Sequence, residues 1–371
     1  GARDLLLDVP VEQVPTVSAR GWNRVAERSV LLAAIAWWFV AWLMGAAVWP
    51  LVAHLAAQWP DLGYALSKGL GLVLVSYISW MGASLHWVPN TVAAAWAILL
   101  LLGTLMWLVV WRREARALVA LLWLKARREE LLFVLPFCAL VTIRVLNPDL
   151  WHPIYGGEKM MEMAMLNAVS KSAYMPPYDP YFAGGVLNYY YYGFYVVSLV
   201  GKLVGLSPEI AFNLAVPTFF ALTITLAFEI GRCVLGAGRL RLWQGLGAAA
   251  CVALLGNLSG AAQYIRQLVH WGCPPGTVGA GGGLGCFMAG IWNWVAGGAP
   301  ALRFDYWWTS TRIIPNTINE FPFFSFLFAD LHPHLMAMPL GLLIVALCGL
   351  LLQDAEARAS RTLKSIPRRR S

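Results

Sequence analysis

The chain has 371 residues, of which 59% are apolar and only 12% are charged. That charged share is about half of what an ordinary soluble domain carries, and aromatic residues make up a further 13%. These figures exclude a soluble globular protein, a disordered chain, collagen and a coiled coil, and they predict an all-α, polytopic transmembrane helix bundle.

The net charge is +8, and 19 of the 27 basic residues fall in four clusters that flank apolar runs. Such clusters are typical of juxtamembrane loops on the cytoplasmic side of a membrane. A nucleic-acid-binding protein needs one contiguous basic face, and membrane-length segments separate these clusters, so we expect no nucleic-acid partner. The clusters fall within residues 3–28, 112–128, 232–241 and 358–370.

Runs without Asp, Glu, Lys or Arg mark the predicted membrane crossings, because a spanning helix needs about 20 apolar residues. We expect about seven crossings on this criterion. They fall within residues 29–60, 69–111 (two crossings), 131–146 (a shorter run that ends in Arg144), 210–228, 242–265 and 331–353.

The basic clusters orient the second half of the chain. If residues 112–130 are cytoplasmic, residues 147–208 and 263–335 form two outer loops. Residues 189–206, interrupted by Lys202, are then expected to lie on the surface or to re-enter rather than cross.

The front half of the chain conflicts with the rule that basic clusters lie on the cytoplasmic side. Three crossings between Arg28 and Arg112 would place one of the two clusters to which these arginines belong outside. Either residues 1–28 are external or one front segment is re-entrant, and the sequence leaves both arrangements open. The predicted organisation is an N-terminal extension with the front helices and a basic cytoplasmic loop (1–130), a membrane module with the two outer loops (131–353) and a basic cytoplasmic tail (354–371).

The two outer loops hold most of the chemically active side chains. Ionisable groups beside a membrane are costly and usually face a cavity or one another, so we expect a functional site there. The acidic candidates are Asp149, Glu158, Glu162, Asp179, Glu320 and Asp330, and the others are Lys159, Arg312, Asn316, His332, His334, Tyr189, Tyr190, Tyr191 and Tyr192.

Several of these residues have two interpretations. Glu158 and Glu162 are four residues apart and share one helix face, either as a solvated face of an interfacial helix or as acids that act chemically. Asp149 follows Pro148 and is equally suited to cap the next helix.

The sequence Asp330–His334 contains three potential metal ligands, but not the i, i+4 histidine spacing of a helical zinc site. A hydrogen-bonded polar cap at the start of the last helix is the favoured interpretation. Asp330 alone is suited to a hard divalent cation, Mg²⁺ or Mn²⁺, beside phosphate oxygens.

Lys159 and Arg312 either hold a phosphate or neutralise nearby acids. The run Tyr189–Tyr192 is either an interfacial anchor or a platform for sugar rings and lipid. Cys273 and Cys286 lie on the predicted outer side, where a disulfide between them is left open.

Three long segments carry a resemblance to a known family, in the right order over most of residues 130–350. They read GGEKMMEMAMLNAV, MPPYDPYFAGGVLNYYYYGF and STRIIPNTINEFPFFSFLFADLHPHLMAMPL. They resemble an uncharacterised prokaryotic membrane protein family named for its YYY motif. That family resembles the GT-C clan of glycosyltransferases, whose sugar donors are polyprenyl phosphates, so a GT-C-like module in the prokaryotic plasma (inner) membrane is implied.

The resemblance also implies roles for particular residues. An acid in the first outer loop is the expected catalytic base in the clan, which points to Glu158, with Asp149 and Glu162 in reserve; the clan usually has an Asp beside this acid, where Gly157 stands here. The donor phosphate would then lie near Lys159, Arg312 and a divalent cation at Asp330.

Two other functions remain as alternatives. One is a non-catalytic membrane subunit that binds lipid, pigment or partner helices in a larger complex. The other is a transporter, which is disfavoured because the spans are expected to contain almost no charge pairs and no inverted repeat is visible.

Overall fold

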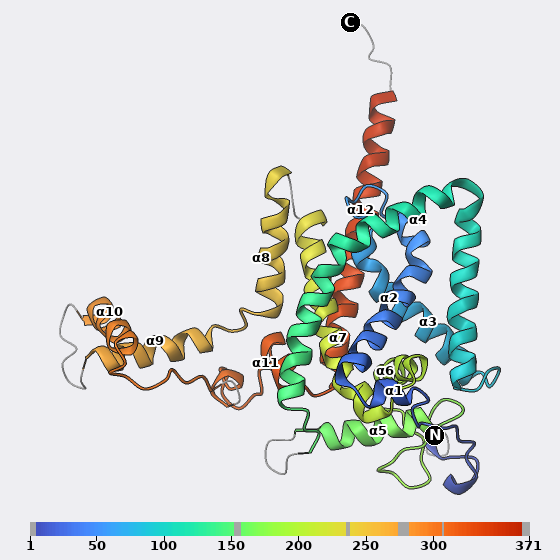
Figure 1. The fold of residues 1–371 in the computed structure, drawn as a ribbon, viewed down its shortest axis with the longest axis horizontal. Coiled ribbons are helices and arrows are strands. Elements are labelled where there is room, and N and C mark those ends of the chain that lie inside the picture. Colours follow the sequence, from blue (N-terminus) through green and yellow to red (C-terminus); the bar gives the residue numbers. More distant parts are fainter. Residues whose placement is uncertain (1–4, 152–156, 235–237, 274–281, 306–307, 366–371) are drawn as a thin grey trace, which may run out of the picture. The chain divides into compact units, whose positions relative to one another are not determined.

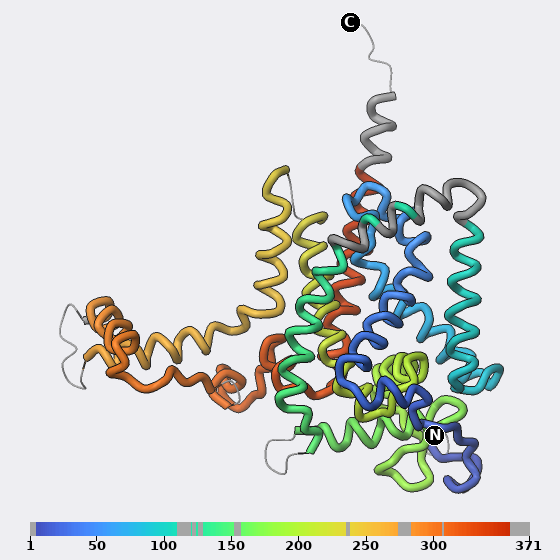
Figure 2. Tube along the Cα trace, in the orientation of Figure 1, coloured from blue at the N-terminus to red at the C-terminus, as the bar shows by residue number. Residues whose placement is uncertain are grey.

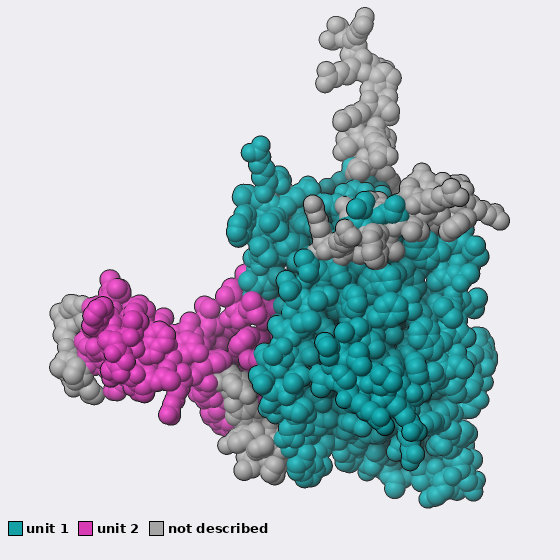
Figure 3. Space-filling model, in the orientation of Figure 1, with its two compact units in different colours: residues 1–250, 329–371 teal, residues 251–328 magenta. Residues whose placement is uncertain are grey.

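The computed structural model describes residues 5–151, 157–234, 238–273, 282–305 and 308–365. These residues form helices joined by loops, with three isolated bridges and no named strand among them. The predicted all-α membrane fold is confirmed. The chain divides into two compact units, residues 1–250 with 329–371 (unit 1) and residues 251–328 (unit 2), which Figure 3 colours separately.

Unit 1 begins with the short helix α1 (Arg24–Glu27), followed by the long helices α2 (Val30–Leu55), α3 (Tyr64–Ser84) and α4 (Val92–Leu146) (Figure 1). Side-chain caps fix where two of them begin. The Ser29 hydroxyl accepts a hydrogen bond from the Leu32 amide, and the Thr91 hydroxyl accepts one from the Ala94 amide.

The rest of unit 1 consists of α5 (Lys159–Lys171), α6 (Tyr191–Val204), α7 (Pro208–Glu229), α8 (Arg241–Ala253) and α12 (Pro333–Ser365). Helix α7 is central, because it packs against α4, α12, α6 and α5. It begins with a proline at its first position, where the missing amide costs no hydrogen bond. A π-helical turn, Ile230–Val234, extends its other end.

Five helices in the described residues are long and apolar enough to cross a membrane, fewer than the seven or so crossings predicted. Residues 131–146 are not counted separately because they form the last limb of the 55-residue helix α4, which also continues through the predicted loop at 112–130. Helix α8 has only 13 residues. Helix α6, with 14 residues, is also too short, in keeping with the expectation that this segment does not cross. The five are Val30–Leu55, Tyr64–Ser84, Val92–Val109, Pro208–Val234 and Pro333–Glu356.

The N-terminal segment packs on the predicted outer loop 147–208 (Figure 2). Isolated bridges pair Leu6 with Gly185 and Thr16 with Ser172, and the Trp22 indole donates to the Lys202 carbonyl at 2.9 Å. Residues 5–28 therefore lie at the same end of unit 1 as α5 and α6. The sequence left two arrangements open. This placement agrees with the one in which residues 1–28 lie on the side of the outer loops and three helices cross between Arg28 and Arg112.

Lys202 acts as an internal cross-link at this end of unit 1. Its ammonium donates to the carbonyl oxygens of Asn90 and Ser170, each at 2.8 Å. Burial lowers the pKa of Lys202 to about 8. The charge that interrupts the apolar run thus joins α6 to α5 and to the loop before α4.

Unit 2 contains α9 (Ser259–Gly272), α10 (Gly282–Val295) and α11 (Pro322–Phe328). Cys273 and Cys286 form a disulfide between α9 and α10, which resolves the pairing left open by the sequence. The two helices touch backbone to backbone, because a Cβ atom on Gly290 would lie 1.7 Å from the Leu268 carbonyl oxygen. Short 3₁₀ turns elsewhere in the chain are Val11–Gln13, Gly238–Leu240 and Thr309–Thr311.

Candidate functional site

The start of α5 and the start of α12 meet in unit 1, and they bring together six of the residues singled out in the sequence. The Lys159 ammonium lies 2.9 Å from Asp330 Oδ1, and the Glu158 amide donates to Asp330 Oδ2 at 3.2 Å. The Leu331 amide donates to Glu162 Oε2 at 2.7 Å. The six residues, called the acid cluster below, are Glu158, Lys159, Glu162, Asp330, His332 and His334.

Local backbone geometry explains why these side chains converge. Glu158 is the residue that precedes α5, so its amide is one of the donors that a helix start leaves without an internal partner. The Asp330 carboxylate accepts from it, and a negative group at a helix N-terminus is stabilised by the helix dipole. Ala329, with φ of 62°, turns the chain just before Asp330, and Pro333 then begins α12.

Glu158 differs from the other two carboxyl groups of the cluster in its exposure to solvent. Its side chain is 53% exposed, whereas Glu162 and Asp330 are 1% and 8% exposed. His332 Nε2 lies 3.2 Å from Glu158 Oε2, and His332 Nδ1 lies 2.8 Å from His334 Nδ1. A neutral His332 fits this chain when its Nε2–H donates to Glu158 and its Nδ1 accepts from His334. Two imidazoles thus orient the one accessible carboxylate of the cluster.

Glu162 is protonated at neutral pH in this arrangement. Burial, together with the negative charge of Asp330, raises the pKa of Glu162 to about 9. Its Oε1 atom is buried and accepts no hydrogen bond from the described residues. Glu162 therefore holds the Leu331 amide as a neutral group, and it is poorly suited to take a proton from a substrate.

The cluster does not fit a divalent cation as it stands. Both carboxylate oxygens of Asp330 are engaged, one by the Lys159 ammonium, which already supplies a positive charge at that position. In the described residues, ligand atoms of three potential metal ligands come within 4.8 Å of one another at Asp61, Glu229 and Cys233. There the Arg232 guanidinium lies 2.6 Å from Glu229 and 3.6 Å from Asp61, so it already supplies a positive charge beside these carboxylates.

The tyrosine run divides into two pairs. The Tyr191 hydroxyl accepts from the Trp80 indole at 3.1 Å, and the Tyr192 hydroxyl lies 3.0 Å from the Ser76 hydroxyl, so both tie α6 to α3. Tyr189 and Tyr190 are exposed, with ring centroids 4.1 Å apart. The exposed pair is the part that remains available to lipid or sugar.

Other predicted residues have local partners. The carboxylates of Asp149 and Asp179 accept backbone amides of the turns that follow them, those of Trp151 and Tyr181, at 2.7 and 2.8 Å. In unit 2, the Arg312 guanidinium lies over the Trp308 ring, Asn316 has a φ of 62°, and Glu320 accepts from the Ser325 hydroxyl at 3.0 Å. The expected roles of Arg312, Asn316 and Glu320 in substrate binding remain predictions from the sequence.

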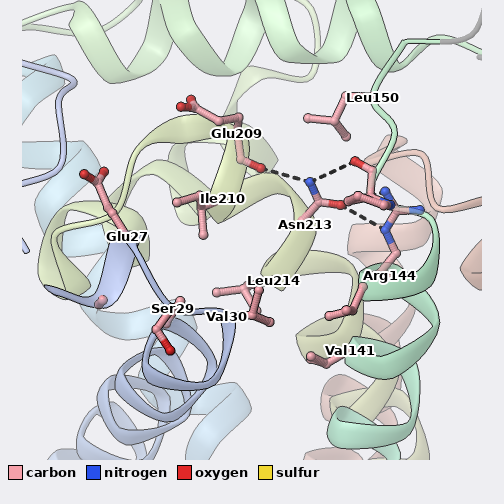
Figure 4. Close-up of a pocket in the computed structure, with 14 residues that line it drawn as sticks. Glu27, Ser29, Val30, Val141, Arg144, Leu150, Glu209, Ile210, Asn213 and Leu214 are labelled. Carbon is pink, nitrogen blue, oxygen red and sulfur yellow. Dashed lines mark hydrogen bonds between the residues drawn. The ribbon is translucent and has the colours of Figure 1, made fainter. Parts of the chain in front are cut away.

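Sequence reasoning did not single out Arg144, which lines a cavity of about 410 Å³ in unit 1 (Figure 4). Arg144 is 6% exposed, and its guanidinium donates to Asn213 Oδ1 through Nε at 3.0 Å and through Nη2 at 2.6 Å. The available signal was a single arginine at the end of the apolar run 131–146.

Buried charge pairs also occur at the opposite end of the bundle, so the expectation of almost no such pairs in the spans is wrong. Lys68, in α3, lies 2.5 Å from Glu130 in α4, and the Tyr64 hydroxyl donates to the same carboxylate at 2.6 Å. Arg232, beyond α7, pairs with Glu129 at 3.1 Å. The acidic residues were assigned to a loop, but α4 continues through them and turns them toward the bundle.

Comparison with protein families gives a match, over residues 74–366, to the model described as "Uncharacterized membrane protein (DUF2298)". Comparisons with curated proteins and with solved structures give no match. The matched range contains every residue of the acid cluster and far more than half of the chain. The chain therefore belongs to the family of uncharacterized membrane proteins DUF2298.

Proposed function

We propose that the protein is a membrane glycosyltransferase-like enzyme that transfers a sugar from a polyprenyl-phosphate donor to an acceptor hydroxyl on the outer face of a prokaryotic plasma membrane. One observation carries the proposal: Glu158 is a solvent-exposed carboxylate that His332 orients at the end of a membrane helix bundle. An enzyme that acts on a lipid-linked substrate needs its base at that position, within reach of both the lipid surface and water.

In the proposed reaction, Glu158 takes the proton of the acceptor hydroxyl while the hydroxyl oxygen attacks the anomeric carbon of the sugar. The bond between that carbon and the lipid phosphate oxygen breaks, and the phosphate leaves with the electron pair. His332 acts as a positioning residue, because its hydrogen bond holds the carboxylate in one orientation.

The remaining cluster residues hold the base in place. The Lys159–Asp330 pair joins the starts of α5 and α12, and Glu162 binds the amide that follows Asp330. Because Asp330 is already engaged by an ammonium group, no step of the proposal runs through a divalent cation.

A transfer assay in proteoliposomes tests the assignment of the base. The purified protein is incubated with polyprenyl-phosphate hexoses and a set of hydroxyl acceptors, and release of polyprenyl phosphate is followed by mass spectrometry. Glu158→Gln should lower the rate by about 100-fold or more, since general base catalysis contributes at least that much. Glu12→Gln, at an exposed glutamate of the N-terminal segment, is the matched control and should leave the rate unchanged.

The outcomes separate the base assignment from the activity itself. A wild-type rate in Glu158→Gln would show that Glu158 is not the base. Absence of turnover with every donor, in protein that remains folded, would favour the alternative of a non-catalytic subunit that binds lipid or partner helices.

A further inference from the structure

A cavity of about 410 Å³ opens in unit 1 between α2, the last turns of α4 and the first turns of α7 (Figure 4). Most of its wall is apolar, so it suits a hydrocarbon chain better than a sugar or a nucleotide. The apolar lining residues include Val30, Ala33, Val141, Ile210 and Leu214.

One wall of this cavity carries a buried positive charge. Arg144 forms no salt bridge with the described residues, and its hydrogen bonds go to neutral acceptors, the Asn213 amide oxygen and the Asp149 carbonyl. The amide nitrogen of Asn213 donates to the Glu209 carbonyl at 3.1 Å, which fixes the amide oxygen toward Arg144. A buried guanidinium whose hydrogen-bond acceptors are all neutral is costly, and an anion in the cavity offsets that cost.

The surroundings of the cavity carry a net positive charge, because three arginines outnumber the two glutamates there. An adjoining cavity of about 530 Å³ is lined by Arg20, Arg24 and Arg28, and it shares Glu27, Glu209 and Ile210 with the first. The three arginines are exposed, so they attract anions from solution and from the membrane surface. The combination of an apolar cavity, a buried cation and a basic mouth fits an amphiphile with an anionic head.

We propose that this cavity binds an amphiphile that has a phosphate headgroup, with the phosphate on the Arg144 guanidinium and the apolar chain between α2, α4 and α7. The planar fork of an arginine matches two phosphate oxygens at once. The inference rests on the proposed function where it takes this amphiphile to be the sugar donor. It assigns the phosphate to Arg144 in place of Lys159, whose ammonium is paired with Asp330.

Arg144 also lies within electrostatic reach of Asp330, a member of the acid cluster, and of Asp149. These two acids act on the guanidinium, and Glu27 and Glu209 also line the cavity. Their negative charges weaken its attraction for a small free anion, so the chain of the amphiphile is needed to supply the rest of the affinity.

Binding to the purified full chain in detergent tests the proposal, read by native mass spectrometry and titration calorimetry. The probes are a polyprenyl phosphate, the polyprenol of the same chain length, phosphatidylglycerol and inorganic phosphate. We expect the polyprenyl phosphate to bind at least 10-fold more tightly than the polyprenol. Arg144→Gln should remove that difference, and Arg144→Lys should restore part of it.

Two further variants complete the design. Val30→Trp fills the cavity from an exposed position on its wall, so it should weaken both polyprenyl probes without disturbing the core. Arg239→Gln makes the same charge change at an exposed position beyond the other end of α7, and it should bind like the wild type.

Equal affinity for the polyprenyl phosphate and the polyprenol would overturn the proposal, as would unchanged binding in both Arg144→Gln and Val30→Trp. Displacement of the lipid by equimolar inorganic phosphate would overturn it too, by showing a site for a free anion. Equal binding of phosphatidylglycerol supports the site and identifies bulk phospholipid as its occupant. Glu158→Gln should bind the lipid normally. Lipid binding by the wild type without sugar transfer would contradict the proposed function and leave this site standing.

Discussion

Glu162 and Glu158 lie one helical turn apart, yet their surroundings give them opposite properties. The sequence places both on one face of a helix and does not distinguish them. In the structure the face turns so that Glu158 reaches solvent, while Glu162 lies beneath the chain that leads into α12. Burial beneath a distant segment, together with the negative charge of Asp330, therefore raises the pKa of Glu162, and no local pattern contains that information.

The raised pKa of Glu162 predicts how stability depends on pH. The folded protein keeps a proton on this carboxyl up to a pKa of about 9, whereas the unfolded chain loses it near the ordinary glutamate pKa of 4.5. Between these values the folded state binds more protons, so the free energy of unfolding falls as pH rises from about 4.5 to about 9. Glu162→Gln should remove this dependence, at about 1.4 kcal/mol per pH unit.

Thermal unfolding in detergent between pH 5 and pH 9 measures the effect. The melting temperature of Glu162→Gln should exceed that of the wild type by an amount that grows with pH, while Glu12→Gln should follow the wild type throughout. Parallel curves for Glu162→Gln and the wild type would contradict a protonated Glu162.

At the scale of the elements, α4 shows how far the sequence determines the fold. Its apolar ends at 92–109 and 131–146 were recognised from composition alone. The intervening basic stretch has the composition of a loop, but it continues as helix. As a result Glu130 faces Lys68 and the Tyr64 hydroxyl inside the bundle, and the pairing depends on packing between α3 and α4 that composition does not encode.

This buried pair should be strongly coupled. Glu130→Gln leaves the Lys68 ammonium without its counter-ion at a site where both side chains are largely buried, so we expect a loss of about 3–5 kcal/mol of stability. The double variant Lys68→Met with Glu130→Gln should recover much of that loss, because no unpaired charge remains. Urea or heat titrations of the two single variants and the double variant form the required cycle. Additive losses would show that the two residues do not interact.

At the scale of the whole molecule, the sequence predicted that the outer loops hold the site, and the acid cluster does join segments from the two predicted loops. Composition was sufficient to single out these residues, because charge is rare in this chain and its clusters stand out. Composition did not predict where residues 5–28 lie. Their arginines resemble a cytoplasmic cluster, and only the pairing of Leu6, Thr16 and Trp22 with residues 172–206 places them at the other end.

Cysteine labelling in oriented membrane vesicles tests this arrangement of the chain. In a variant whose free cysteines Cys138, Cys233, Cys251 and Cys348 are replaced by serine, single cysteines are introduced at exposed positions. Ser18→Cys and Tyr181→Cys should react with a membrane-impermeant maleimide from the same side, since both positions belong to segments that pack at the α5–α6 end of unit 1. Arg239→Cys, beyond the far end of α7, should react only from the opposite side.

The labelling pattern separates the two arrangements that the basic clusters left open. With three crossings between residues 28 and 112, an odd number of membrane passes separates Ser18 from the basic stretch at 112–128. The N-terminal arginines then lie on the opposite side of the membrane from that stretch. Labelling of Ser18→Cys together with Arg239→Cys would mean that one of the front helices re-enters instead. It would also take Arg20, Arg24 and Arg28 away from the mouth of the Arg144 cavity. The same labelling experiment therefore tests both the topology and the proposed lipid site.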